Sequence, residues 1–103
     1  MATDQPRLSA QTLKVLGALM SSSQAELSGA EIGRTTKLAS GTLYPILLRL
    51  EQAGWLESHW EDDDPRTLGR PRRRFYRVTA LGAKSARAAF QELEPTFTRL
   101  AWS

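Results

Sequence analysis

The sequence predicts a mainly α-helical domain that carries a two-stranded β-hairpin. Apolar residues recur with helical spacing in three segments before residue 54, and each segment has a serine at its expected start. Two later segments, 56–61 and 73–79, alternate apolar with polar residues or are rich in aromatic and β-branched ones, which is typical of strands. A fourth apolar stripe returns to helical spacing near the C-terminus. The chain has 103 residues, the length of one domain.

Two helices are expected in the first third of the chain. The first covers about residues 9–22 and has Ser9 as its N-cap. The second begins at Ser28 and ends at about residue 36. Ser28 and Glu31 have the spacing of a capping box, in which the serine hydroxyl accepts from the amide three residues on and the glutamate reaches back to the serine amide.

The third predicted helix, residues 40–53, has one apolar face and one face of small and polar residues. We expect Ser40 as its N-cap, and Gly54 is suited to the position just past its end. The buried face is predicted to hold Leu43, Ile46, Leu47 and Leu50. The opposite face then holds Gly41, Pro45, Leu48, Arg49 and Gln52. Free amides at the start of such a helix can meet a phosphate, although any surface helix shows a polar outer face.

A long loop joins the two expected strands. It consists of about 11 residues, 62–72, and contains Asp64-Pro65, Gly69 and Pro71. Because a tight hairpin turn needs only two residues, we expect the loop to project from the domain. Thr79 then caps the last helix. Three closely spaced helices followed by such a hairpin form the outline of a winged helix-turn-helix, with the loop as its wing.

Arginines are concentrated in the wing and the strand after it. The net charge is only +3, from 14 Lys+Arg against 11 Asp+Glu, but six arginines fall within residues 66–77. Guanidinium groups offer paired hydrogen bonds to phosphates and can enter a minor groove. The acidic run 61–64 gives a second interpretation, in which the arginines pair with nearby carboxylates and keep the loop folded back. Nucleic-acid binding accounts for both the arginines and the exposed face of helix 40–53.

Several ordered motifs give a specific resemblance. They are Ser40-Gly41-Thr42-Leu43-Tyr44-Pro45-Ile46-Leu47, Arg49-Leu50-Glu51, Gly54-Trp55-Leu56, Trp60-Glu61 and the run from Gly69 to Thr79, followed by Gly82. In this order and at these separations, over about residues 8–89, the chain resembles the PadR family of bacterial transcriptional regulators. Ser40 is a departure, because many relatives carry proline there.

The resemblance implies a dimeric winged helix-turn-helix repressor that binds a pseudo-palindromic operator in double-stranded DNA. By position, the start of the DNA-reading helix falls on Ser40, Gly41, Thr42, Tyr44 and Pro45, and the wing arginines are Arg70, Arg72, Arg73 and Arg74. We add Arg49 from the exposed face of the same helix. The alternative is a winged helix that binds proteins, or binds any nucleic acid without operator specificity.

The last predicted helix carries an apolar seam with a heptad-like spacing. Its members are Ala83, Ala86, Phe90, Leu93, Phe97 and Leu100. This stripe is longer than the winged core can cover, so we expect a homodimer whose interface includes Leu13, Leu16, Met20, Phe90, Leu93, Phe97 and Leu100. The alternative is that the helix folds back onto its own first helix. Pro95 predicts a kink or a break near Glu94.

The expected organisation is a disordered N-terminus over 1–7, a DNA-binding domain over 8–79 and a dimerisation helix over 80–103. The lack of cysteine excludes disulfide scaffolds and thiolate zinc sites and favours a cytoplasmic protein. No apolar run reaches the roughly 18 residues that span a bilayer, so no membrane partner is expected. His59 between Glu57 and Glu61 imitates an acid–base cluster, but strand alternation explains it better. We expect no enzymatic activity, metal or cofactor.

A small-molecule effector is a further partner that the resemblance suggests, without its identity. Trp55, Trp60 and Trp102 would line a pocket between subunits, or Trp55 and Trp60 pack the hairpin against the helices, which we favour. Relatives that sense many drugs place a tryptophan inside the last helix. The corresponding stretch here, 90–93, has none.

Overall fold

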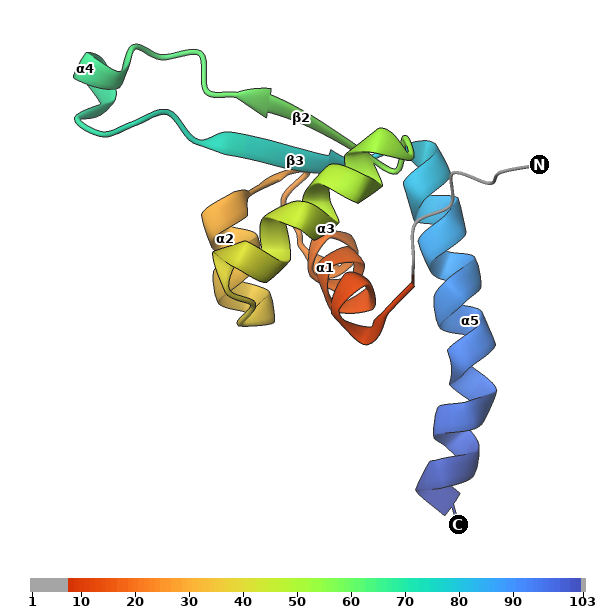
Figure 1. Cartoon of the computed structure of the whole chain (residues 1–103). Coiled ribbons are helices and arrows are strands. Elements are labelled where there is room, and N and C mark those ends of the chain that lie inside the picture. Colours follow the sequence, from red (N-terminus) through yellow and green to blue (C-terminus); the bar gives the residue numbers. More distant parts are fainter. Residues whose placement is uncertain (1–7, 103) are drawn as a thin grey trace.

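The computed structural model describes the backbone of residues 8–102 and the side chains of residues 8–93. The elements follow in the order α1 (Ala10–Ser21), β1 (Leu27–Ser28), α2 (Gly29–Thr36), α3 (Ser40–Gln52), β2 (Leu56–Trp60), α4 (Pro65–Leu68), β3 (Arg74–Val78) and α5 (Ala80–Trp102). Figure 1 shows α1, α2 and α3 grouped below the sheet, the loop with α4 projecting from one end, and α5 descending at the other. The mainly helical fold with its projecting wing is confirmed.

The starts of the first two helices are set by the expected serines. The Ser9 hydroxyl accepts from the Thr12 amide at 3.1 Å. Ser28 accepts from the Glu31 amide at 3.1 Å, and its own amide donates to the Glu31 carboxylate at 2.9 Å, so the capping box is confirmed. Local hydrogen bonds alone therefore fix where α1 and α2 begin.

The start of α3 differs from the prediction. Ser40 is its first helical residue, and the N-cap is Ala39, which offers no side-chain hydrogen bond. The Ala39 carbonyl accepts from the Thr42 amide at 3.0 Å and from the Leu43 amide at 2.9 Å. Ser40 as N-cap was therefore wrong by one position. Its hydroxyl is left at the exposed first turn, and Gly54, with a φ of 81°, follows the helix as expected.

The sheet has three strands in the order β1-β3-β2, where the sequence had predicted a two-stranded hairpin. β2 and β3 pair antiparallel from Leu56 opposite Val78 to Trp60 opposite Arg74, within two residues of their predicted bounds. The additional strand pairs Leu27 with Tyr76 and Ser28 with Phe75. A two-residue strand is too short to show an alternating pattern in the sequence. β1 exists only through its pairing with β3.

The core lies between the three helices and one face of the sheet. Its fully enclosed side chains include Val15, Leu16, Ile32, Leu43, Leu47, Leu50 and Leu56. Trp55 joins them with 4% of its surface exposed, whereas Trp60 is 54% exposed. Packing of Trp55 against the helices is confirmed, and the same expectation for Trp60 was wrong. Trp60 lies at the far end of β2, where the chain leaves the helices for the wing.

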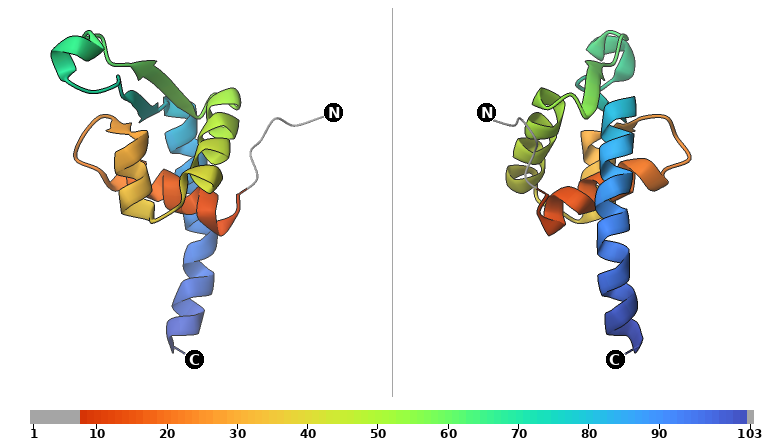
Figure 2. Two further views of the ribbon diagram at one scale, coloured as in Figure 1. Left: turned by 60° about the vertical axis from the view of Figure 1, so that its left-hand side comes forward. Right: turned by 90° about the vertical axis from the view of Figure 1, so that its right-hand side faces the viewer.

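α5 leaves the domain as one continuous helix. The Thr79 hydroxyl accepts from the Gly82 amide at 3.0 Å, which confirms the expected cap. Ala86 and Ala89 are buried against the core, and farther along Figure 2 shows the C-terminal half extending beyond the other elements. Its backbone stays helical through Pro95, so, of the kink or break expected near Glu94, the break is absent. Proline removes one helical hydrogen bond there without ending the helix.

No helix within the described residues combines the length and the apolar character needed to cross a membrane. Residues 1–7, together with the side chains of Phe97, Leu100 and Trp102, lie outside what the structure describes.

Candidate nucleic-acid interface

The outer face of α3 is open to solvent, as its period of 100° per residue predicts. Leu43, Ile46, Leu47 and Leu50 are buried on the inner face. The exposed residues of this helix are Ser40, Gly41, Tyr44, Pro45, Leu48, Arg49 and Gln52, with Thr42 half-buried. Leu48 is the most exposed large apolar side chain described, at 55%. α3 therefore presents a surface that combines one cation, small residues and apolar groups suited to contact base edges.

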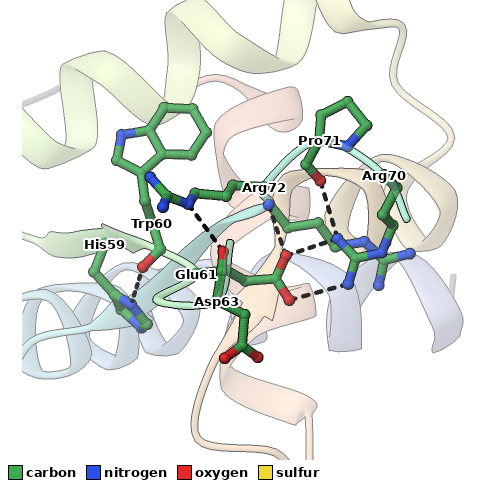
Figure 3. Close-up of polar contacts among 8 residues, drawn as sticks. His59, Trp60, Glu61, Asp63, Arg70, Pro71 and Arg72 are labelled. Carbon is green, nitrogen blue, oxygen red and sulfur yellow. Dashed lines mark hydrogen bonds and ion pairs between the residues drawn. The ribbon is translucent and has the colours of Figure 1, made fainter. Parts of the chain in front are cut away.

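The wing is organised around Glu61, at the end of β2 (Figure 3). Its carboxylate accepts from both terminal nitrogens of Arg70, at 2.6 and 3.0 Å, and from the Arg73 amide at 2.8 Å. The Glu61 side chain is only 16% exposed. The hydrogen bonds from Arg70 and then from the Arg73 amide lower the pKa of Glu61 to about 2. At neutral pH the Glu61 carboxylate is therefore ionised, and both of its oxygens accept hydrogen bonds from within the wing.

The tip of the wing contains a short helix that the sequence had not predicted as one. Asp64 caps α4 by accepting from the Arg66 amide at 2.9 Å, Pro65 opens it, and Gly69 closes it with a φ of 68°. These residue types mark a helix start and end, so the signal was present in the sequence. Arg72 donates from Nε to the Asp63 carbonyl at 3.0 Å, which ties the returning strand of the loop to the outgoing one.

Arg74 ties the base of the wing to α3. Its guanidinium lies 3.5 Å from the Glu51 carboxylate and stacks 5.1 Å from the centre of the Trp60 ring. Glu51 also accepts from the Ser58 hydroxyl at 2.7 Å. These contacts explain why Trp60 is placed outside the core, since its ring supports a wing arginine. Arg74 is therefore engaged within the chain.

A cleft of about 400 Å³ connects the wing with α2 and α3. It is lined by Ser28, Gly29, Ala30, Tyr44, Trp60, Arg72, Arg73, Arg74 and Tyr76. Tyr44 lies so close to α2 that a Cβ at position 29 would come within 2.7 Å of its hydroxyl oxygen. The cleft thus brings together Tyr44, three wing arginines and the start of α2, whose helix dipole is positive at this end.

Only some of the residues that the sequence analysis predicted for DNA contact line the cleft. Tyr44, Arg72, Arg73 and Arg74 line it, whereas Ser40, Gly41, Thr42, Pro45, Arg49 and Arg70 do not. Residues 28–30, Trp60 and Tyr76 were missed as members of this site. Residues 28–30 lie beside Tyr76 because β1 and β3 pair across 47 or more residues of sequence. Trp60 joins them through the pairing of β2 with β3, and no local pattern marks such contacts.

The apolar residues predicted for a dimer interface whose side chains the structure describes fall into three groups, and Phe97 and Leu100 lie outside them. Leu13, Phe90 and Leu93 line, with Ala10 and Lys14, a depression of about 310 Å³ between α1 and α5. Met20 is half-buried, and Leu16 is fully enclosed in its own chain's core. Leu16 therefore has no surface left for a partner. Phe90 also approaches its own α1, because a Cβ at Gly17 would lie 3.8 Å from its ring.

His59 makes its surface contacts with Glu26 and Phe75 and not with Glu57 or Glu61, which flank it in sequence. Its Nε2 lies 2.7 Å from the Glu26 carboxylate, and its ring stacks on Phe75 at 5.8 Å. The hydrogen bond with Glu26 raises the pKa of His59. Glu57 pairs instead with Arg77, and Glu61 with Arg70. Among the described residues, no group of three or more metal-ligating side chains occurs.

Comparisons with solved structures show the same fold. A PadR family transcription regulator from Clostridium difficile R20291 matches 91% of this chain and 97% of its own, with a TM-score of 0.74 and 20% identity. The protein smu.1704 from Streptococcus mutans UA159 is 27% identical, with a TM-score of 0.69, over 93% of this chain and 89% of its own. Bacillus subtilis PadR in complex with operator DNA matches 80% of this chain but 48% of its own, with a TM-score of 0.65 and 19% identity.

The family comparison covers most of the chain. A search of the curated proteins finds no significant match. The model of the transcriptional regulator PadR-like family matches residues 18–88, which include the end of α1, all of α2 and α3, the sheet, the wing and the start of α5. The chain therefore belongs to the PadR-like family of transcriptional regulators.

Proposed function

We propose that this regulator acts as a homodimeric repressor in the bacterial cytoplasm and binds a pseudo-palindromic operator. The observation that carries the proposal is the cleft in which Tyr44 of α3 meets Arg72 and Arg73 of the wing. A phosphate backbone is the ligand that suits a cleft lined by guanidinium groups, a phenol and a helix start. The solved complex of Bacillus subtilis PadR with operator DNA supports this assignment.

Within this proposal, α3 reads bases and the wing positions the protein on the backbone. Ser40, Gly41 and Thr42 lie at the first turn of α3, followed on its open face by Pro45 and Arg49. An α-helix fits the major groove, where arginine recognises guanine and apolar groups contact the thymine methyl. Arg72 and Arg73 contact phosphates from the side. Arg74 supports them through its contacts with Glu51 and Trp60.

Dimerisation would place two copies of α3 on successive turns of the duplex. The apolar depression lined by Leu13, Phe90 and Leu93 is the surface that we assign to the partner copy. Two reading helices about 34 Å apart would recognise a site with matching half-sites. Phe97 and Leu100 extend the same heptad-like spacing along α5.

The test is selection from random duplexes of about 30 base pairs, long enough for two half-sites, followed by footprinting. We expect the full chain to enrich a pseudo-palindrome and to lower transcription from a reporter promoter that contains it. Binding to all duplexes alike would instead support a non-specific nucleic-acid-binding module. Absence of any binding would favour a protein-interaction role and refute the proposal. The double variant Arg72→Ala, Arg73→Ala serves as the control that binds the selected duplex more weakly.

A further inference from the structure

The arginines of the wing have unequal surroundings. Both terminal nitrogens of Arg70 bond Glu61, and one of them also donates to the Pro71 carbonyl at 3.1 Å. Arg72 and Arg73 are exposed, and the contact of Arg72 uses only Nε. The terminal nitrogens are the paired donors with which arginine grips a phosphate. In Arg70, three of the four terminal N–H groups already donate within the chain.

Glu61 closes the wing from both sides. Its carboxylate reaches Arg70 and the Arg73 amide, while its own amide donates to the Arg73 carbonyl at 2.9 Å. One residue at the end of β2 therefore holds the last residues before β3. Release of the carboxylate would loosen the returning end of the loop, where the hydrogen bond from the Glu61 amide to Arg73 and the contact of Arg72 with Asp63 remain, and DNA binding would then have to order this segment again.

We propose that Glu61 and Arg70 form a clamp that positions Arg72 and Arg73 for DNA, and that Arg70 is not itself a DNA contact. This inference rests on the proposed DNA-binding function. It assigns to an acidic residue a favourable role in binding a polyanion, and it removes Arg70 from the contacts that the sequence suggested. If Arg70 turned to a phosphate, the Glu61 carboxylate would lose its ion pair beside the DNA and keep only the hydrogen bond from the Arg73 amide, which is electrostatically unfavourable.

The first experiment compares Glu61→Gln with Asp62→Asn. Both variants remove one negative charge from neighbouring positions, and Asp62 is exposed. Simple charge repulsion predicts that both bind a duplex more tightly than the unchanged protein. The clamp predicts that the two variants differ in affinity. Glu61→Gln should weaken binding about fivefold or more, because the loop is less ordered before it binds. Asp62→Asn should leave binding equal or tighter. If Glu61→Gln binds as tightly as Asp62→Asn, the clamp is refuted.

The second experiment compares Arg70→Lys with Arg72→Lys. Lysine keeps the positive charge but loses the planar fork that spans both carboxylate oxygens. A phosphate contact tolerates this change, because lysine still neutralises the charge, whereas a bidentate clamp does not. We expect Arg70→Lys to weaken binding as much as Glu61→Gln, and Arg72→Lys to weaken it by less. Near-unchanged binding by Arg70→Lys would show that position 70 acts as a phosphate contact.

The double variant Glu61→Gln, Arg70→Gln connects the two results. Residues that act as one unit give non-additive effects, so the double variant is expected to bind no more weakly than Glu61→Gln alone. Fully additive losses would refute the clamp. In the free protein, hydrogen exchange at the Arg73 amide should speed up in Glu61→Gln and stay unchanged in Asp62→Asn.

The probe is the duplex recovered by the selection above, or a mixed-sequence duplex of about 30 base pairs if none is enriched. The two proposals fail differently. If the unchanged protein binds neither probe, the proposed function fails and the clamp fails with it. If the unchanged protein binds but Glu61→Gln binds the duplex as tightly as Asp62→Asn, only the clamp fails. Thermal unfolding of each variant verifies that the core, from which the wing projects, remains folded.

Discussion

At the scale of single residues, Gly82 fixes how α5 joins the domain. A Cβ at this position would lie 2.1 Å from the Trp55 carbonyl oxygen, which already accepts from the Thr79 amide at 3.0 Å. Neither backbone can move without breaking the junction between α5 and β2. We expect Gly82→Ala to lower the free energy of unfolding by about 1–3 kcal/mol, as overpacking does.

The matched control is Gly41→Ala, since a Cβ at position 41 meets nothing within 4 Å. That change should be neutral or stabilise the helix by about 0.5–1 kcal/mol. Urea unfolding measures both. Equal stability of the two variants would mean that the contact at Gly82 does not constrain the fold.

Glu61 provides a prediction about pH. Its pKa lies at about 2, below the ordinary 4.5, because Arg70 and the Arg73 amide bond the ionised form. A lowered pKa means that the contribution of the contact is complete above pH 4.5 and is lost as the pH falls towards 2. The wing should therefore stay closed throughout the neutral range. The carboxyl carbon shift of Glu61, followed by NMR, should titrate near pH 2.

The control for this titration is Arg70→Gln. It removes the largest cause of the lowered pKa, so the titration of Glu61 should move up towards 4.5. A midpoint near 4.5 in the unchanged protein would contradict the wing geometry.

At the scale of elements, the parts that could be predicted are those fixed by neighbours in sequence. The caps at Ser9 and Ser28 depend on residues three positions away, and α3 buries one face by its period alone. β1 could not be predicted, because its two residues form a strand only where β3 pairs with them. Ser40 was misassigned because serine is the residue type that favours the N-cap position. In the structure, the carbonyl of Ala39 accepts the first helical hydrogen bonds, so the helix begins one residue later than predicted.

The candidate site divides in the same way. Tyr44 and the wing arginines could be predicted from motifs that are continuous in sequence. The acidic run 61–64 already indicated that carboxylates there would pair with wing arginines, and the contact of Arg70 with Glu61 agrees with it. The contact of Arg74 with Glu51 could not be predicted, because it depends on the antiparallel pairing of β2 and β3 and the packing of α3 on that hairpin. The positions of the arginines in the sequence showed that positive charge is concentrated in residues 66–77. Only the three-dimensional arrangement separates the arginines that hold the wing from those that face outward.

The wing as an element should determine the salt dependence of DNA binding. Each phosphate neutralised contributes about −0.9 to the slope of log affinity against log salt. Replacing Arg72 and Arg73 by alanine should therefore make the slope shallower by about 1.8 if each contacts one phosphate. Fluorescence anisotropy over a salt series measures the slope.

Arg77→Ala is the control for this measurement, because it removes one positive charge from β3, where Arg77 pairs with Glu57 and lies outside the cleft. Its slope should match that of the unchanged protein. Equal slopes for all three proteins would show that the wing arginines do not contact phosphates.

At the scale of the whole molecule, α5 leaves an apolar surface that one chain covers only in part. Leu13 and Leu93 face the depression between α1 and α5, and the helix continues beyond the rest of the domain (Figure 2). A second copy that brings its own α5 to this surface would enclose both. In the dimer that we propose, this arrangement would also link the two copies of α3, so that the second half-site would be bound at a high effective concentration.

Leu93→Asp tests this arrangement, because it places a charge in the depression without altering α3 or the wing. We expect the variant to sediment as a monomer and to bind the duplex at least about tenfold more weakly, since its half-sites are bound independently. Leu81→Asp is the matched control on the same helix, where Leu81 is 52% exposed and lies outside the depression. The control should remain a dimer with unchanged affinity. If Leu93→Asp also remains a dimer, the subunits associate through another surface, and the seam of α5 serves the single chain alone.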